Sequence, residues 1–235
     1  MLLGTPVVFV VDDDASVRRS LALLIDSASW HAETFASAQE FLSCPRVRSP
    51  SCLVLDVTLP DLDGLELQER VAAERMDMPI IFISGYGDVP MTVRAMKAGA
   101  MEFLTKPLGT EPLLNAIRHA IERSSAVLAE EAAMRSLREC YASLTGRERE
   151  VMALVVSGLL NKQIGAELDI SEITVKAHRG SMMRKMKANS LAHLVNMTAR
   201  LGIGLCDPVN RCRSAVRTAH DAQGARAAAG QWLQH

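Results

Sequence analysis

Residues 7–21 read VVFVVDDDASVRRSL, and this stretch decides the fold of the first half of the chain. The apolar run at 7–11 is typical of a strand that is buried on both faces. Three carboxylates, Asp12, Asp13 and Asp14, follow directly and precede an amphipathic helical pattern. Asp14 is placed to favour the N-terminus of that helix. Adjacent carboxylates at the end of a buried strand repel one another, so a counter-charge is expected close to them.

Four more short apolar runs follow, at 32–35, 52–56, 79–84 and 101–104. Between them lie segments whose apolar residues recur at three- and four-residue spacing, and a last helix is expected to begin near Glu111. Five alternations of strand and helix predict an α/β fold with a doubly wound, five-stranded parallel sheet and helices on both faces.

Composition and charge predict two domains with different partners. The chain has 235 residues, of which 49% are hydrophobic and 4% aromatic, so its cores are built from aliphatic side chains. Residues 1–123 contain 11 Lys and Arg against 17 Asp and Glu, whereas residues 145–201 contain 9 against 5. An acidic first half and a basic second half favour different binding partners for the two halves.

The sequence pattern divides the chain into four segments. Residues 1–123 form the α/β domain, and residues 124–143 are rich in Ala, Glu and Arg and are expected to be a helical linker. Residues 144–201 have helical patterns only and predict an all-α domain of four helices. Residues 202–235 have little apolar content and no clear period, which predicts a disordered tail.

Cysteine usage and hydropathy predict a cytoplasmic protein with no membrane partner. The five Cys residues are odd in number and scattered, which fits neither a disulfide framework nor a zinc site. The N-terminus lacks the features of a signal peptide, and no apolar run is long enough to span a bilayer.

Chemically useful side chains follow several of the predicted strands. In a doubly wound sheet, binding sites form beyond the carboxyl ends of the strands. Asp12 and Asp13 follow the first strand, Asp56 ends the third, Ser84 ends the fourth and Lys106 follows the fifth. Carboxylates suit Mg²⁺, while an ammonium and a hydroxyl suit a phosphoryl group. These five residues are therefore expected to form one site for a metal and a phosphoryl group.

The first half resembles the receiver domain of two-component response regulators, which has a CheY-like (flavodoxin-like) fold. The matching segments are VVDDD, LVLDVTLPDLDGLEL, PIIFISGYGD and AMKAGAMEFLTKP. The resemblance implies that Asp56 accepts a phosphoryl group from a phosphohistidine of a sensor histidine kinase. It further implies that Asp13, Asp56 and the carbonyl of Thr58 hold Mg²⁺, or Mn²⁺ as an alternative, with Asp12 assisting through water.

The same resemblance implies a switch. Ser84 and Lys106 would bind the phosphoryl oxygens, and Phe103 matches the aromatic switch position. Lys106-Pro107 matches the usual cis peptide of the family. A phosphorylation-dependent homodimer would form through the face made by the fourth helix and the fifth strand, VPMTVRAMKAGAMEFL (89–104), with Val93 and Lys97 as contact residues.

The second half contains the pattern of a helix-turn-helix. NKQIGAEL (161–168) reads as a short helix, and Ser171 is a good N-cap for the next one. At about 100° per residue, the second helix has one apolar face and one basic face. Val175, Met182 and Met186 lie on the apolar face with the packing residue His178 at its edge, whereas the opposite face carries Lys176, Gly180 and Lys187.

Residues 144–197 resemble the LuxR-type DNA-binding domain, so the chain as a whole resembles a FixJ/NarL-family regulator of the FixJ/StyR-like kind. The resemblance implies that Lys176, Ala177 and Gly180 face the bases, and that Lys162, Thr174 and Arg179 meet phosphates. Gly180 and Gly165 depart from the family pattern. Both are expected to weaken their helices, and Gly180 also removes a base contact.

The predicted function is therefore a phosphorylation-controlled transcription regulator that binds double-stranded promoter DNA, with RNA polymerase as a further partner, and that is not an enzyme. A Mg²⁺ phosphohydrolase would be expected to place a general-acid Asp where this chain has Thr58. An unphosphorylated interaction module is disfavoured by the complete residue set, and a quorum sensor by the receiver pattern. The sequence leaves open whether the resting state is autoinhibited or monomeric.

Overall fold

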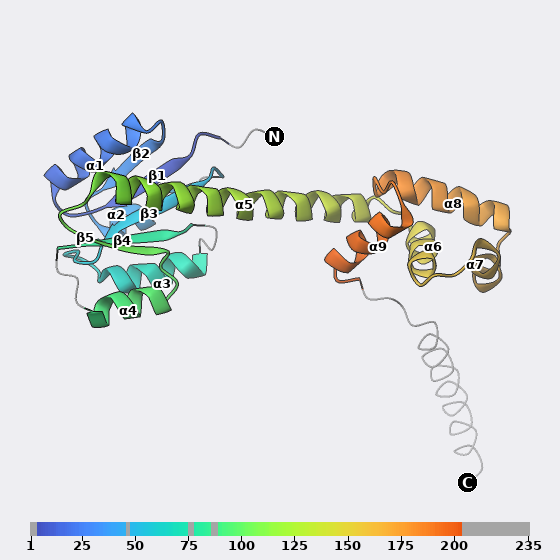
Figure 1. Cartoon of the computed structure of the whole chain (residues 1–235). Helices are drawn as coiled ribbons and strands as arrows, with labels where there is room; N and C mark the ends of the chain where they lie inside the picture. The colour runs from blue at the N-terminus through green and yellow to red at the C-terminus, as the bar shows by residue number, and fades with distance from the viewer. Residues whose placement is uncertain (1–3, 46–47, 75–77, 86–88, 204–235) are drawn as a thin grey trace, which may run out of the picture. The chain divides into compact units, whose positions relative to one another are not determined.

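The computed structural model describes residues 4–45, 48–74, 78–85 and 89–203, and the chain divides into two compact units at Ala132 and Ala133. The first unit is a parallel sheet with helices on both faces, and the second contains helices (Figure 1). In the part of the chain that the structure describes, no helix combines the length and apolar character needed to cross a bilayer.

The sheet of the first unit has the strand order β2-β1-β3-β4-β5, and all of its pairs are parallel. The three central strands, β1, β3 and β4, are buried along their whole length because helices cover both faces. The edge strands β2 and β5 are only partly buried. The strands are β1 (Val7–Val11), β2 (His31–Phe35), β3 (Ser51–Asp56), β4 (Ile80–Ser84) and β5 (Glu102–Thr105). The predicted doubly wound, five-stranded parallel sheet is confirmed.

Two apolar cores lie on opposite faces of this sheet. One core contains Phe9, Phe41 and Phe82 and packs beneath α2, α3 and α4. The other contains Val10 and Ile25 and packs beneath α1 and the first part of α5 (Figure 1). The helices are α1 (Ala15–Ser27), α2 (Ala38–Leu42), α3 (Gly64–Glu74), α4 (Val89–Lys97) and α5 (Thr110–Ala142).

The helix α5 is 33 residues long. Its first part packs in the core of the first unit, and its last part packs in the core of the second unit. Ser124 is fully buried, and its hydroxyl accepts a hydrogen bond of 3.0 Å from the backbone N–H of Ser51 in the first unit. Leu137, near the other end, is buried in the core of the second unit. The segment 124–143, expected as a helical linker, is thus helical as far as Ala142.

The second unit packs α6 (Gly146–Val156), α7 (Asn161–Leu168), α8 (Glu172–Lys185) and α9 (Leu191–Arg200) around one apolar core. The N-caps of α6, α8 and α9 are hydroxyl side chains, which satisfy backbone N–H groups of the first turn. The prediction of a four-helix domain is confirmed. The predicted disordered tail, apart from residues 202 and 203, lies outside the described residues.

Candidate functional site

The carboxylates of Asp12, Asp13 and Asp56 meet at the carboxyl edge of the sheet. One oxygen of each carboxylate lies within 4.8 Å of the corresponding oxygens of the other two. Asp12 and Asp56 are buried, whereas Asp13 is exposed to solvent. The convergence follows from topology, because β1 and β3 are parallel neighbours and both end at this edge. An acidic pocket of this kind can bind a hard divalent cation.

Lys106 supplies the counter-charge in this pocket. Its Nζ lies 2.8 Å from Oδ2 of Asp12 and 2.6 Å from Oδ2 of Asp56. Burial alone would lower the pKa of Lys106, but its hydrogen bonds to the two carboxylates outweigh that effect and raise the pKa above its usual value. Burial raises the pKa of Asp12, although the hydrogen bond from Lys106 opposes this.

Backbone groups hold the two buried carboxylates in place. The N–H of Asp14 donates to Oδ1 of Asp12 at 2.8 Å, and the N–H of Thr58 donates to Oδ1 of Asp56 at 3.0 Å. Gly64 lets the chain after β3 pass close by, because a Cβ there would lie 2.9 Å from the carbonyl oxygen of Asp56. The side chains of Asp12 and Asp56 thus keep one oxygen each for Lys106.

Asp14 does not belong to the pocket. Its side chain caps α1 by accepting from the N–H groups of Ser16, at 2.7 Å, and Val17. This is the helix-terminus role expected from the sequence. Arg18 was not among the predicted site residues, yet its Nη1 donates to the carbonyl of Asp12 at 2.7 Å and ties α1 to the end of β1. The sequence could not predict this contact, because it depends on the path of the chain between β1 and α1.

Ser84 and Phe103 lie on β4 and β5, the two successive strands on one side of β3, which carries Asp56. Ser84 is buried at the end of β4, and its carbonyl accepts from the N–H of Lys106 at 2.7 Å. The ring of Phe103 on β5 is half-buried, and its centroid lies 6.2 Å from that of Phe82. The Lys106-Pro107 peptide is cis, as the sequence comparison with receivers implied. The roles of Ser84 and Phe103 in a switch, and of the Thr58 carbonyl as a metal ligand, stay predictions.

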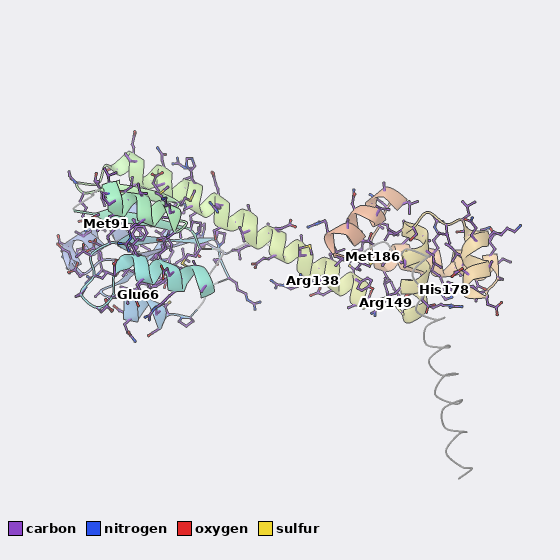
Figure 2. The ribbon with its side chains drawn as sticks, turned by 90° about the horizontal axis from the view of Figure 1, so that it is seen from below. Glu66, Met91, Arg138, Arg149, His178 and Met186 are labelled. Carbon is purple, nitrogen blue, oxygen red and sulfur yellow. The ribbon has the colours of Figure 1, made fainter. Side chains whose placement is uncertain are left out.

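The outer face of α4 exposes apolar side chains. Val93 is 43% exposed, and Lys97 on the same helix is exposed as well. Val89 and Met96, which were not predicted, add exposed apolar surface at 76% and 44%. Met91, labelled in Figure 2, instead packs against the core. Of the two predicted contact residues, Val93 therefore belongs to a larger apolar face of α4, made by Val89, Val93 and Met96, and Lys97 is exposed next to Met96 in the chain.

In the second unit, α7 and α8 form the predicted helix-turn-helix. Asp169 ends α7 in the left-handed conformation at φ 52°, and the side chain of Ser171 caps α8 by accepting from the N–H of Thr174. The turn also needs Gly165, since a Cβ there would lie 2.8 Å from the carbonyl oxygen of Ile170. The missing side chain of Gly165 thus leaves room for the turn, a role that the sequence did not indicate, while its weakening of α7 stays a prediction.

The apolar side of α8 faces the core as predicted. Val175, Met182 and Met186 are fully buried, and His178 is half-buried at the edge of this face (Figure 2). A buried carboxylate on another helix also holds α8 in place, although the sequence pattern did not indicate it. Glu148 of α6 accepts hydrogen bonds from Oγ of Ser181 and Nζ of Lys185, both at 2.7 Å.

The pKa of Glu148 is lowered to about 2. The largest cause is the hydrogen bond from Lys185, followed by those from Ser181 and from the backbone of Thr145. The carboxylate therefore stays ionised in the folded protein and joins the first turn of α6 to the last turns of α8. The capping box formed by Thr145 and Glu148 could have pointed to a buried acid here.

The predicted DNA-facing residues are in different environments. Lys176, Ala177 and Gly180 are exposed on α8, and Lys176 forms an ion pair of 3.0 Å with Glu172. Lys162 is exposed on α7, whereas Nη1 of Arg179 donates to Oδ1 of Asn161 at 3.0 Å. The Thr174 hydroxyl lies 2.8 Å from that of Ser171.

One placement was wrong. Lys187 was projected onto the outer face of the second helix, but α8 ends at Lys185 with Met186 as its C-cap. Lys187 has a φ of 55°, so the chain leaves the helix at this residue. The helical spacing of about 100° per residue therefore does not apply to Lys187.

Comparison with known proteins gives the same two parts. Residues 8–118 match the model of the response regulator receiver domain, and residues 142–198 match that of the bacterial regulatory proteins of the luxR family. Nodulation protein W of Bradyrhizobium diazoefficiens is 48% identical over 197 residues, which cover 84% of this chain and 87% of that protein. The response regulator protein TodT of Pseudomonas putida is 45% identical over 195 residues, covering 83% of this chain and 86% of TodT.

Solved structures agree with this assignment. The structure of the response regulator StyR matches with a TM-score of 0.78 and 46% sequence identity. The match covers 84% of this chain and 100% of the StyR chain. Full-length FixJ from B. japonicum has a TM-score of 0.51 and 41% identity, covering 86% of this chain and 99% of that one. The chain therefore belongs to the FixJ/NarL-like response regulators of two-component systems, with a receiver domain and a LuxR-type DNA-binding domain.

Proposed function

We propose that Asp56 accepts a phosphoryl group from a phosphohistidine of a sensor histidine kinase, and that this modification controls binding of the second unit to promoter DNA. The observation that carries the proposal is the pocket itself. Asp56 is buried beside Asp12 and within 2.6 Å of the Lys106 ammonium, so its carboxylate is held in one orientation next to a cation. Such preorganised charge is what phosphoryl transfer needs.

The residues of the pocket fit a divalent metal ion, as their three converging carboxylates show. Asp13, Asp56 and the Thr58 carbonyl would hold it, and Asp12 would assist through water. When bound, Mg²⁺ (or Mn²⁺) supplies positive charge that offsets the carboxylates and the phosphoryl oxygens. An oxygen of Asp56 attacks phosphorus while the bond to the histidine nitrogen breaks. Lys106 then donates to the new phosphoryl oxygens instead of sharing both carboxylates.

The switch proceeds from Asp56 on β3 through β4 to β5. Phosphorylation adds negative charge and acceptor oxygens at the end of β3. The hydroxyl of Ser84, buried at the end of β4, is then drawn toward the phosphoryl group, and the half-buried ring of Phe103 turns inward behind it. The face of α4 and β5 changes shape, and two receivers pair through it, with Val93 and Lys97 in the contact.

The paired second units bind two half-sites on double-stranded DNA. The domain is basic, and its helix-turn-helix leaves the face of α8 with Lys176, Ala177 and Gly180 open to a major groove. Lys162 and Thr174 meet phosphates from the flanks, and Arg179 can do so if it leaves Asn161. The protein acts in the cytoplasm, activates transcription together with RNA polymerase and has no catalytic turnover of small substrates.

DNA selection from a random duplex pool tests this function. The full-length protein is treated with acetyl phosphate and Mg²⁺ and used to enrich duplexes from the pool, beside untreated protein and Asp56→Asn. We expect the treated protein to enrich a sequence with two similar half-sites, and to bind it more tightly than untreated protein or the variant does. Failure of every form to enrich a sequence contradicts the DNA-binding function, and equal binding by all three forms contradicts its control by phosphorylation.

A further inference from the structure

Ile173 lies in the first turn of α8 and is 80% exposed. A large aliphatic side chain in that position gains nothing from the core of its own domain. The core-facing positions of α8 are filled by Val175, Met182 and Met186, which are fully buried. Packing within the unit therefore does not account for this exposed side chain.

Ile173 extends the open face of α8 by one turn. At about 100° per residue, Ile173, Lys176, Ala177 and Gly180 fall within an arc of about 100°, and the middle of this arc is opposite the buried face. We call these four residues the outer stripe of α8. All four are exposed, and a Cβ at Gly180 would meet no atom within 4 Å.

The outer stripe offers few hydrogen-bonding groups. Ala177 presents a methyl group and Gly180 no side chain, while the Lys176 ammonium is already paired with Glu172 at 3.0 Å. Small residues let the helix backbone approach a partner closely, and Ile173 then projects as its largest apolar group. The stripe is suited to a partner with an accessible methyl group more than to one with polar edges.

The charge of the surrounding domain indicates what that partner is. Residues 145–201 carry 9 Lys and Arg against 5 Asp and Glu, and Lys162 and Arg184 are exposed on α7 and α8. A basic domain favours a polyanion over an apolar protein surface. In the major groove of DNA, the apolar group presented by the base edges is the 5-methyl of thymine.

We propose that Ile173 packs against a thymine methyl group in the major groove and makes the protein select an A·T pair at one position of each half-site. The inference rests on the proposed DNA-binding function and deepens it by naming a specificity-determining residue. It also explains how α8 can discriminate bases although Ala177 and Gly180 provide no hydrogen bond.

Replacement of thymine by deoxyuridine tests the contact, because it removes only the methyl group. The duplex enriched by phosphorylated wild-type protein is remade with deoxyuridine at each thymine of a half-site in turn. Binding is measured for full-length wild type, Ile173→Ser, the conservative variant Ile173→Val, and Leu23→Ser. The last removes another exposed aliphatic side chain, which lies on α1 of the receiver and is 68% exposed.

At one position, we expect deoxyuridine to weaken wild-type binding by about fourfold, as for the loss of one buried methyl group. Ile173→Ser should bind the thymine duplex about fourfold more weakly and show no further loss with deoxyuridine, whereas Ile173→Val and Leu23→Ser should keep the discrimination. Equal losses for wild type and Ile173→Ser at every position would overturn the inference while leaving DNA binding intact. If wild type enriches no duplex, the proposed function and the inference both fall.

Discussion

The ammonium of Lys106 lies 2.6 Å from Oδ2 of Asp56, although 50 positions separate the two residues along the chain. The contact depends on the parallel sheet, which brings the end of β3 and the segment after β5 to one edge with β4 between them. It also places the Asp56 carboxylate beside a cation that Asp12 holds from the other side. A carboxylate that receives a phosphoryl group needs such a fixed positive charge next to its oxygens.

Loss of the Lys106 ammonium should destabilise the receiver when no divalent metal is present. In Lys106→Met, Asp12, Asp13 and Asp56 repel one another without a counter-charge. We expect the free energy of unfolding to fall by about 1–3 kcal/mol, measured by urea unfolding in EDTA. Addition of Mg²⁺ should restore part of this loss. Lys97→Met, which removes an exposed lysine from α4, should unfold like wild type. Wild-type stability of Lys106→Met in EDTA would show that the pocket needs no cation.

Acid should loosen α8 through Glu148. The pKa of this carboxyl is about 2 in the folded protein, against an ordinary value of 4.5. A depressed pKa contributes stability that is present above pH 4.5 and is lost as the pH falls toward 2. The protection factors of α8 amides, which are corrected for the intrinsic pH dependence of exchange, should therefore fall across this window.

Glu148→Gln is the matched variant for that measurement. Its α8 amides should have lower protection factors at neutral pH, and these should not fall further with acid. Glu150→Gln, whose half-exposed partner is Arg147, should behave like wild type. Exchange must be followed locally, because receiver carboxyls also contribute to the pH dependence of stability: the raised pKa of Asp12 acts in the opposite direction and the lowered pKa of Asp61 in the same direction. The same pH profile in wild type and Glu148→Gln would contradict the assigned role.

Substitution by alanine at two glycines of the DNA-binding unit should change its stability in different ways. Gly180 lies inside α8 with open space around it, so Gly180→Ala should stabilise the unit by about 0.5–1 kcal/mol. Gly165→Ala should gain less or lose stability, since the new Cβ would meet the Ile170 carbonyl at 2.8 Å. Thermal unfolding of the full-length variants measures the pair. An equal gain for both would show that the turn after α7 can move at no cost.

The apolar face of α4 should carry the phosphorylation-dependent dimer. Val93→Glu places a charge in the middle of that face, where Val93 is 43% exposed, and should abolish dimerisation after acetyl phosphate treatment. Sedimentation velocity measures the change, and intact mass checks that phosphorylation is unaffected. Leu23→Glu, on α1, should dimerise normally. If Val93→Glu still dimerises, the dimer interface does not include this face of α4.

The elements and the acidic pocket could be predicted because strong local patterns specified them. β1, β3 and β4 are continuous apolar runs, and parallel topology then forces Asp12, Asp56 and Lys106 to one edge. Contacts that depend on loop paths could not be predicted. Arg18 reaches the Asp12 carbonyl, and the side chain of Asp61 accepts from the N–H groups at the start of α2.

A helix end and a close approach of two segments were also missed. Lys187 continues the periodic pattern of α8, but the helix ends two residues earlier and the chain turns through a left-handed residue. The cost of Gly165 in α7 is local and could be expected from the sequence, whereas its close approach to Ile170 is a tertiary contact. Periodicity does not contain information of either kind.

Intact mass after incubation with acetyl phosphate and Mg²⁺ tests the central claim most directly. The account predicts one phosphoryl adduct on the wild-type protein, dependent on Mg²⁺ and absent from Asp56→Asn. Hydroxylamine should remove it, as expected for an acyl phosphate. A folded wild-type protein that takes no phosphoryl group from either acetyl phosphate or a phosphorylated histidine kinase, or an adduct that persists in Asp56→Asn, would contradict the assignment of Asp56 as the phosphoacceptor.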